Sequence, residues 1–277
     1  MERIKKLISY INEFASCTVE DNIGMYAAQA SFFLIISAIP FMMLMLAVLQ
    51  FIIPFSESDI IHLINQYIPS KIVPWVEDIT NEIFNNSSNI SIISVTAVSA
   101  LWLASRGFMA LYTGLNNVAG VKKLPNYFYS RIIAVVYTIC FLALMIFAFV
   151  LFGAGKRLSE MLEEKSFIFS DILMFLMDMR IFVGLILLTM CFSLFYTFLP
   201  NEKMRIQRQI PGAFLASAGW IGFSYAYSIY IEYFSNYSYV YGSLTAVVFL
   251  MFWLYFCMDI FLFGAEFNKI AQKKLFK

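Results

Sequence analysis

The sequence has little charge and few of the residues that build metal centres and disulfide frameworks. Asp, Glu, Lys and Arg make up 13% of its 277 residues, about half the share of a typical soluble domain. One histidine and four scattered cysteines leave little for a His/Cys metal site or a set of disulfides. The 19 Lys and Arg almost balance the 18 Asp and Glu, so there is no basic field of the kind that attracts nucleic acid.

Motifs of the common enzyme classes are absent as well. The sequence contains no GxSxG elbow, phosphate-binding P-loop, HExxH pair or Cys/His cluster. Its adjacent acids, Glu77-Asp78 and Glu163-Glu164, are typical of a solvated helix face and only weakly favour metal-dependent hydrolysis. We therefore predict a protein that is not an enzyme and that carries no cofactor or metal.

Apolar residues, in contrast, are abundant. They make up 61% of the chain, against 45–50% in soluble domains, and this excess is too large for a water-soluble fold. A membrane-crossing helix needs about 20 mostly apolar residues, and six runs of that kind occur, at about 30–53, 83–105, 132–155, 181–199, 211–231 and 244–265. The predicted fold is an all-α, polytopic membrane protein: one integral membrane domain over 1–277 with six transmembrane helices.

Basic residues set the predicted orientation. If the N-terminus is cytoplasmic, 14 of the 19 Lys and Arg fall in inner segments and 5 in outer ones, as the positive-inside rule requires. Both termini are therefore expected on the cytoplasmic side. Between the first two runs, residues 54–82 have the pattern of two short amphipathic helices that lie on the outer surface of the membrane or cap the bundle.

The fifth run carries two faces of different chemistry. At 100° per residue, Ser217, Ser224 and Ser228 point in one direction, and several small residues point roughly the opposite way. Two interpretations of the serines stay open: each hydroxyl bonds a carbonyl of its own helix, or together they form the polar wall of a translocation path. The small residues allow a neighbouring helix to approach closely. We predict helix packing at Gly212, Ala216, Gly219, Ala226, Gly242 and Gly264.

Ionisable residues inside apolar runs form a second candidate site, because each is costly in a membrane unless it is paired or hydrated. Asp259 lies in the sixth run, Glu266 follows seven residues later on the same face, and Arg106 ends the second run at the same depth. An Arg106–Asp259 or Arg106–Glu266 ion pair is one hypothesis, and snorkelling to the membrane boundary is the other. Pro40, inside the first run, predicts a kink. The positions expected to line a path or to be polar within the membrane are Ser37, Pro40, Arg106, Asn116, Ser217, Ser224, Ser228, Asp259 and Glu266.

Four stretches carry a resemblance to a known family. They are Ala27–Phe33 leading to Ser37–Pro40, Gly107–Asn117, Leu199–Asn201 followed by Ile210–Ala213, and Tyr241–Val247 followed by Leu262–Glu266. In this order and spacing, over about residues 20–270, the chain resembles the YihY/BrkB family of bacterial inner-membrane proteins. Arg106 and Asp259 depart from the family pattern.

The resemblance implies a six-helix bundle in the bacterial cytoplasmic membrane. Family members have carried a ribonuclease BN label, generally regarded as a misassignment, and a virulence-factor label, and some are proposed to move lipids or lipid-linked envelope precursors. The expectation is a transporter or flippase-like protein that contacts membrane lipids and takes a lipid or a lipid-linked amphiphile, with no nucleic-acid partner and with a homo-oligomer left open. The alternative is a non-transporting envelope scaffold that binds lipid or a partner protein.

Overall fold

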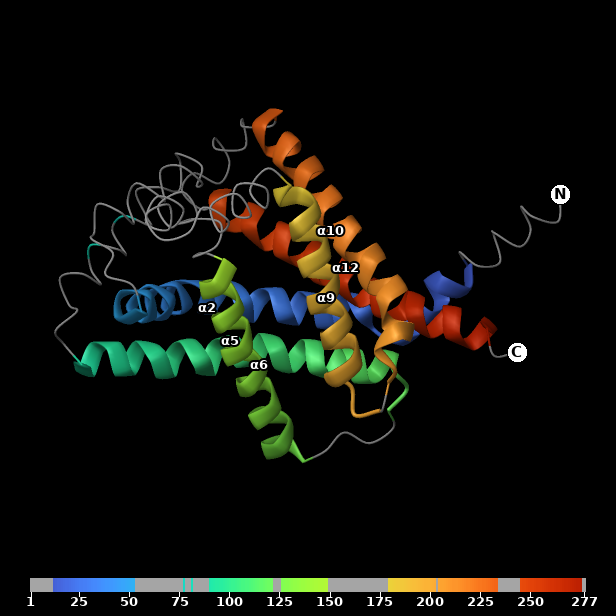
Figure 1. Cartoon of the computed structure of the whole chain (residues 1–277), viewed down its shortest axis with the longest axis horizontal. Helices are drawn as coiled ribbons and strands as arrows, with labels where there is room; N and C mark the ends of the chain where they lie inside the picture. Colours follow the sequence, from blue (N-terminus) through green and yellow to red (C-terminus); the bar gives the residue numbers. More distant parts are fainter. Residues whose placement is uncertain are drawn as a thin grey trace, which may run out of the picture. The chain divides into compact units, whose positions relative to one another are not determined.

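The computed structural model describes residues 12–52, 77, 81, 90–121, 126–148, 179–202, 204–233 and 245–275, and within them the chain forms helices joined by short turns. Six long helices stand in this part (Figure 1): α2 (Ile23–Ile52), α5 (Ile90–Val118), α6 (Tyr127–Ala148), α9 (Arg180–Phe198), α10 (Ile206–Tyr233) and α12 (Thr245–Leu275). A shorter helix over residues 12–20 precedes α2. The all-α, polytopic prediction is confirmed.

Each of the six apolar runs overlaps one of these long helices. Five of them, α2, α5, α6, α9 and α12, are long and apolar enough to cross a membrane. Helix α10 covers the fifth run but is not one of the five, because its serines, glycines and tyrosines lower its mean hydropathy. The predicted outer segment 54–82 lies outside the described residues apart from Glu77 and Asn81.

Helix α5 is described from Ile90 and continues past Arg106 to Val118. Apolar side chains in this continuation, including Phe108, Leu111 and Leu115, are buried. Burial of one helix face explains why the helix does not stop at the first charged residue.

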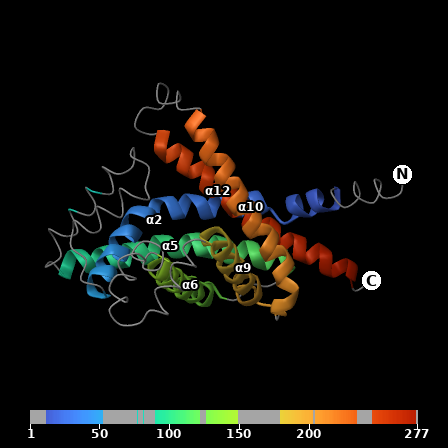
Figure 2. The same ribbon diagram turned by 45° about the horizontal axis from the view of Figure 1, so that its top comes forward.

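The described helices fall into two compact units, with breaks after Phe33 in α2, after Ser105 in α5 and after Ala134 in α6. Unit 2 contains the second half of α2, the first half of α5 and the second half of α6. Its core is apolar: Leu44, Leu46, Leu49, Ala100, Leu142 and Ile146. Helix α2 continues through Pro40, and its ribbon curves in its second half (Figure 2). The buried Ser37 hydroxyl donates to the Leu34 carbonyl of its own helix at 2.9 Å.

Unit 1 contains the first turns of α2, the end of α5, the start of α6, and helices α9, α10 and α12. Helices α10 and α12 lie side by side in both views (Figures 1 and 2). They run antiparallel, since the Trp253 indole donates to the Ser224 hydroxyl near one end and Asn268 bonds Gly212 near the other. Aromatic side chains of α9, α10 and α12 fill the space between these helices: Phe192, Tyr196, Trp220 and Phe261.

Candidate functional site

Two glycines allow α10 and α12 to touch backbone to backbone. A Cβ atom added to Gly212 would overlap the Gly264 carbonyl oxygen and lie 2.5 Å from the Asn268 side chain. A Cβ added to Gly264 would lie 2.6 Å from the Gly212 carbonyl oxygen and 2.6 Å from the Tyr196 hydroxyl. Such close contact between small residues is typical of helix pairs in membranes.

A buried asparagine joins the same two helices by hydrogen bonds. Asn268, 2% exposed, accepts from the Gly212 N–H at 2.8 Å. Its side-chain amide donates to the Gln209 carbonyl at 2.9 Å and to the Gln209 Oε1 at 3.0 Å. One turn further along α12, Gln272 donates to the Arg208 carbonyl at 3.4 Å. The last turns of α12 thus hold the first turns of α10, where Pro211 has no N–H to donate.

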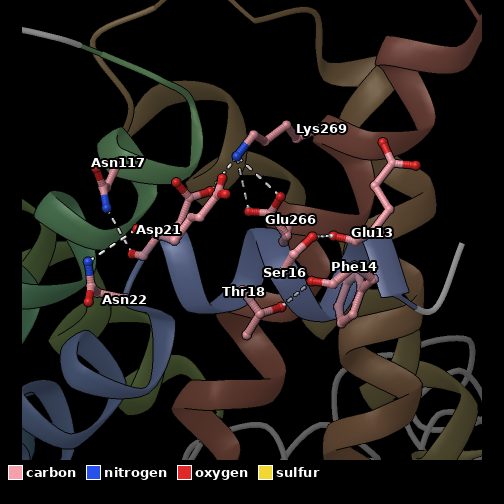
Figure 3. Close-up of polar contacts among 10 residues, drawn as sticks. Glu13, Phe14, Ser16, Thr18, Asp21, Asn22, Asn117, Glu266 and Lys269 are labelled. Carbon is pink, nitrogen blue, oxygen red and sulfur yellow. Dashed lines mark hydrogen bonds and ion pairs between the residues drawn. The ribbon is translucent and has the colours of Figure 1, made fainter. Parts of the chain in front are cut away.

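An ion cluster joins the start of α2 to α12 (Figure 3). The Lys269 ammonium contacts the Asp21 carboxylate and lies 3.2 Å from Glu266 Oε1. Glu266 is 0% exposed. Asn117, at the end of α5, donates to the Asp21 carbonyl at 2.8 Å. Asn22 takes a left-handed backbone conformation, with φ 53°, and its carbonyl accepts the first hydrogen bonds of α2. Three segments that are far apart in the sequence therefore meet at one charged cluster.

A second buried acid lies on the same face of α12. Asp259 precedes Glu266 by seven residues, about 10 Å along the helix, and is 9% exposed. Its carboxylate interacts with the Tyr255 hydroxyl, which lies 3.3 Å from the position that a Cβ of Gly24 would take. Asp259 Oδ1 and Glu266 Oε1 are both buried without a hydrogen-bond partner among the described residues. Helix α12 therefore presents an acidic, buried face beside the first turns of α2.

A third polar contact fixes the turn after α9 to the end of α5. The Asn201 N–H donates to Asn116 Oδ1 at 2.8 Å, and the Asn201 side-chain amide donates to the Tyr112 hydroxyl at 2.9 Å. Asn116, which is buried, also donates to the Tyr112 carbonyl at 2.7 Å. These three hydrogen bonds thus hold the turn after α9 against the last turns of α5.

Asn116→Ala is expected to lower the free energy of unfolding by about 2 kcal/mol, because it leaves the Asn201 N–H without its acceptor. Asn201→Ala removes only one side-chain bond, so its effect is expected to be about 1 kcal/mol. Thermal unfolding of the purified variants in detergent measures both values. Glu202→Ala, an exposed position in the same turn, is the control, and a larger loss in Asn201→Ala than in Asn116→Ala would contradict the prediction.

Comparison with known proteins identifies the family. The sequence model of the family described as "Virulence factor BrkB" matches residues 15–276. The chain belongs to the BrkB family. No solved structure matches it.

Several relatives of this BrkB-family chain match over most of their length. A Bacillus subtilis protein named as the ribonuclease-like protein YfkH is 29% identical over 248 residues, which cover 90% of each chain. A UPF0761 membrane protein of Vibrio vulnificus is 22% identical over 96% of this chain and 83% of its own. Another, from Aliivibrio fischeri, is 25% identical over 93% of this chain and 81% of its own. The chain is therefore a membrane protein of the BrkB/UPF0761 group.

The structure brings together three of the four stretches that carry the BrkB resemblance. Asn116, from the stretch that ends α5, bonds Asn201, from the turn after α9. Gly212, from the second part of the stretch that contains Asn201, meets Gly264, from the last stretch, in the α10–α12 contact. Residues of these stretches are therefore far apart in the sequence but in contact within unit 1.

The pairing proposed for Arg106 is not what the structure shows. Glu266 pairs with Lys269, three residues later on the same helix, and Asp259 interacts with Tyr255. The exposed Arg106 guanidinium lies over the Phe33 ring, 5.4 Å from its centroid. Within the described parts of the chain, no ion pair joins Arg106 to either acid. The expected similarity in membrane depth was therefore not enough to identify the partners of these acids.

The two predicted faces of α10 are only partly distinct. Gly212, Ala216 and Gly219 do contact α12, through Gly264 and Ile260, whereas Ala226 is exposed. Gly242 lies outside the described residues.

The three serines of α10 have three different environments. Ser217 is fully buried, and its hydroxyl has no hydrogen-bond partner among the described residues. Ser224 accepts from the Trp253 indole at 3.1 Å, and Ser228 is exposed. Helix α12 therefore covers part of the serine face as well as the small residues.

Residues that the sequence analysis missed are Asn268, Gln209, Lys269 and Asp21. Lys269 carried a local signal, because an acid and a lysine three residues apart are neighbours on a helix. Asn268 follows Gly264 by four residues, so it lies on the same helix face as a predicted contact. In the described part of the chain, no three His, Cys, Asp or Glu side chains come together in a way that would hold a metal ion.

Proposed function

We propose that this protein moves an amphiphile, a lipid or a lipid-linked envelope precursor, across or between the leaflets of the bacterial cytoplasmic membrane. The observation that carries the proposal is the buried acidic face of α12. This helix is apolar enough to span a membrane, yet it holds Asp259 and Glu266, each at least nine-tenths buried. Ionisable groups inside apolar spans are costly and usually serve a substrate or ion path.

The exposed surfaces of the other helices support an amphiphilic substrate rather than a small hydrophilic solute. Helix α9 exposes large apolar side chains along much of its length, including Ile181, Ile186, Met190 and Leu194. Such surfaces suit acyl or polyprenyl chains, and the polar groups of unit 1 suit a headgroup.

The proposal also includes the orientation. The contact of Asp21 with Lys269 joins the start of α2 to the end of α12, which supports placing both termini on one side of the membrane. The bias of basic residues favours the cytoplasmic side.

Exchange of lipid between leaflets tests the proposed function. The purified protein is reconstituted into liposomes that contain a fluorescent phospholipid or polyprenyl-phosphate analogue, and a membrane-impermeant quencher measures how much label reaches the outer leaflet. We expect exchange well above that of protein-free liposomes. Asp259→Asn is expected to slow it about tenfold, as for a lost interaction of roughly 1.4 kcal/mol.

Gly222→Ala is the matched control for the exchange experiment, because a Cβ at this exposed α10 position meets no other atom within 4 Å. It should exchange lipid at the wild-type rate. Absence of exchange by the wild-type protein, for zwitterionic, anionic and polyprenyl lipids alike, would contradict transport and favour the scaffold.

A further inference from the structure

The ion cluster at the start of α2 contains two acids and one base. Lys269 contacts Asp21 and lies 3.2 Å and 3.5 Å from the two carboxylate oxygens of Glu266 (Figure 3). If both carboxyl groups were ionised, the cluster would hold one negative charge in excess. Two carboxyl groups that share one site are not both ionised easily.

The two carboxyl groups meet at the same Lys269 ammonium. Two carboxylates are acceptors only, so a hydrogen bond between them needs a proton on one. Glu266 Oε1 is an acceptor atom that lacks a hydrogen-bond donor in the described part of the chain. It is buried and has no hydrogen-bond partner among the described residues, because Lys269, although near, does not approach it with hydrogen-bond geometry.

Burial decides which acid holds the proton. The Glu266 side chain is 0% exposed, whereas those of Asp21 and Lys269 are 16% and 35% exposed. An ion in the most buried position has the largest desolvation penalty. Asp21, which is closer to water and in contact with Lys269, is the better site for the negative charge.

We propose that Glu266 carries a proton at neutral pH and shares it with Asp21, so that the cluster is a proton-binding site that joins the segment 12–22 to α12. With the proton in place, one carboxylate faces one ammonium. When the proton leaves to water, two carboxylates compete for Lys269, and the contact between the segment 12–22 and α12 weakens.

The groups around Glu266 are consistent with this assignment. From α12 they are Lys269 and, two turns earlier, Asp259 with Tyr255. From the segment 12–22 they are Asp21 and Cys17, and from α5 the cluster receives only the neutral Asn117. Burial raises the pKa of the Cys17 thiol above its ordinary value, so this thiol stays neutral at neutral pH and adds no charge to the cluster. Among the described residues around Glu266, Lys269 is the one cation in contact with it.

Infrared spectroscopy of the full-length protein in lipid bilayers tests the proton directly. The carbonyl stretch of protonated carboxylic acids is recorded from about pH 6 to about pH 9. We expect the wild-type spectrum to lose one carboxylic-acid group per chain as the pH rises. Glu266→Gln should lack this band. Asp21→Asn should lack it at neutral pH too, because Glu266 is then the sole partner of Lys269 and ionises.

Glu20→Gln is the matched control, since Glu20 is an exposed acid one residue from Asp21, and it should keep the band. A second readout is the melting temperature, which should fall from pH 6 to pH 9 in the wild type and stay nearly constant in Glu266→Gln. The proposal is overturned if the wild type has no such band, if Glu266→Gln keeps it, or if Asp21→Asn keeps it. None of these outcomes depends on lipid exchange, so the proton site and the proposed transport can fail separately.

Discussion

Gly264→Ala is expected to give little folded protein, with a loss of about 3 kcal/mol or more in the free energy of unfolding. The new methyl group would lie 2.6 Å from the Gly212 carbonyl oxygen, 2.6 Å from the Tyr196 hydroxyl and 2.7 Å from the Ala216 Cβ. None of these atoms can move away easily. The first belongs to backbone, and the buried Tyr196 hydroxyl is held by the Phe261 carbonyl. Only a separation of α10 from α12 would remove these steric overlaps.

The measurement is the monodisperse fraction after size-exclusion chromatography, together with the melting temperature in detergent. Gly184→Ala and Gly222→Ala are the controls, because a Cβ at either position meets nothing within 4 Å. Alanine favours a helix over glycine by about 1 kcal/mol, so the controls should match or exceed the wild type. A Gly264→Ala protein as stable as the controls would show that the two backbones are not in contact.

Asn268→Ala is expected to lower the free energy of unfolding by about 3 kcal/mol, because it removes three hydrogen bonds from a buried position. The Gly212 N–H and the polar groups of Gln209 would lose their partner. Asn268→Asp separates the contributions: it keeps the acceptor for the Gly212 N–H but replaces the donor to Gln209 with a charge, so it should be at least as unstable as alanine.

Gln207→Ala serves as the control for the Asn268 variants, because Gln207 is an exposed amide in the same first turns of α10. It should melt within a few degrees of the wild type. An Asn268→Ala protein that melts with the control would mean that water replaces the amide without loss and that the α10–α12 contact depends on the glycines alone.

The helices themselves were predictable because length and apolarity are local properties. Each apolar run overlaps a helix, and the small residues of α10 pointed to a close neighbour, since periodicity shows which residues share a face. Periodicity does not show which other helix supplies the partner. Asn268 and Gly212 are 56 residues apart, and nothing in either helix alone names the other.

The misplaced Arg106 pair has a similar cause. Depth in the membrane follows from position along a helix, but the direction of a side chain around the helix depends on how the helices pack. Arg106 therefore lies over the Phe33 ring, and the Lys269 ammonium contacts Glu266 instead. Asp21 was missed for a different reason: it lies in the short connection before α2, ahead of every apolar run.

The contact between Asp21 and Lys269 joins residues 248 positions apart, and this separation has a consequence for biosynthesis. The segment 12–22 leaves the ribosome before its partner helix α12, which is made after the other long helices described here. Until then, the Asp21 carboxylate lacks the Lys269 ammonium, and the entry into α2 has its local bonds and, once α5 is made, the bond from Asn117 to the Asp21 carbonyl. The Asp21–Lys269 contact therefore forms only after α12, the last of the long helices described here, has been made.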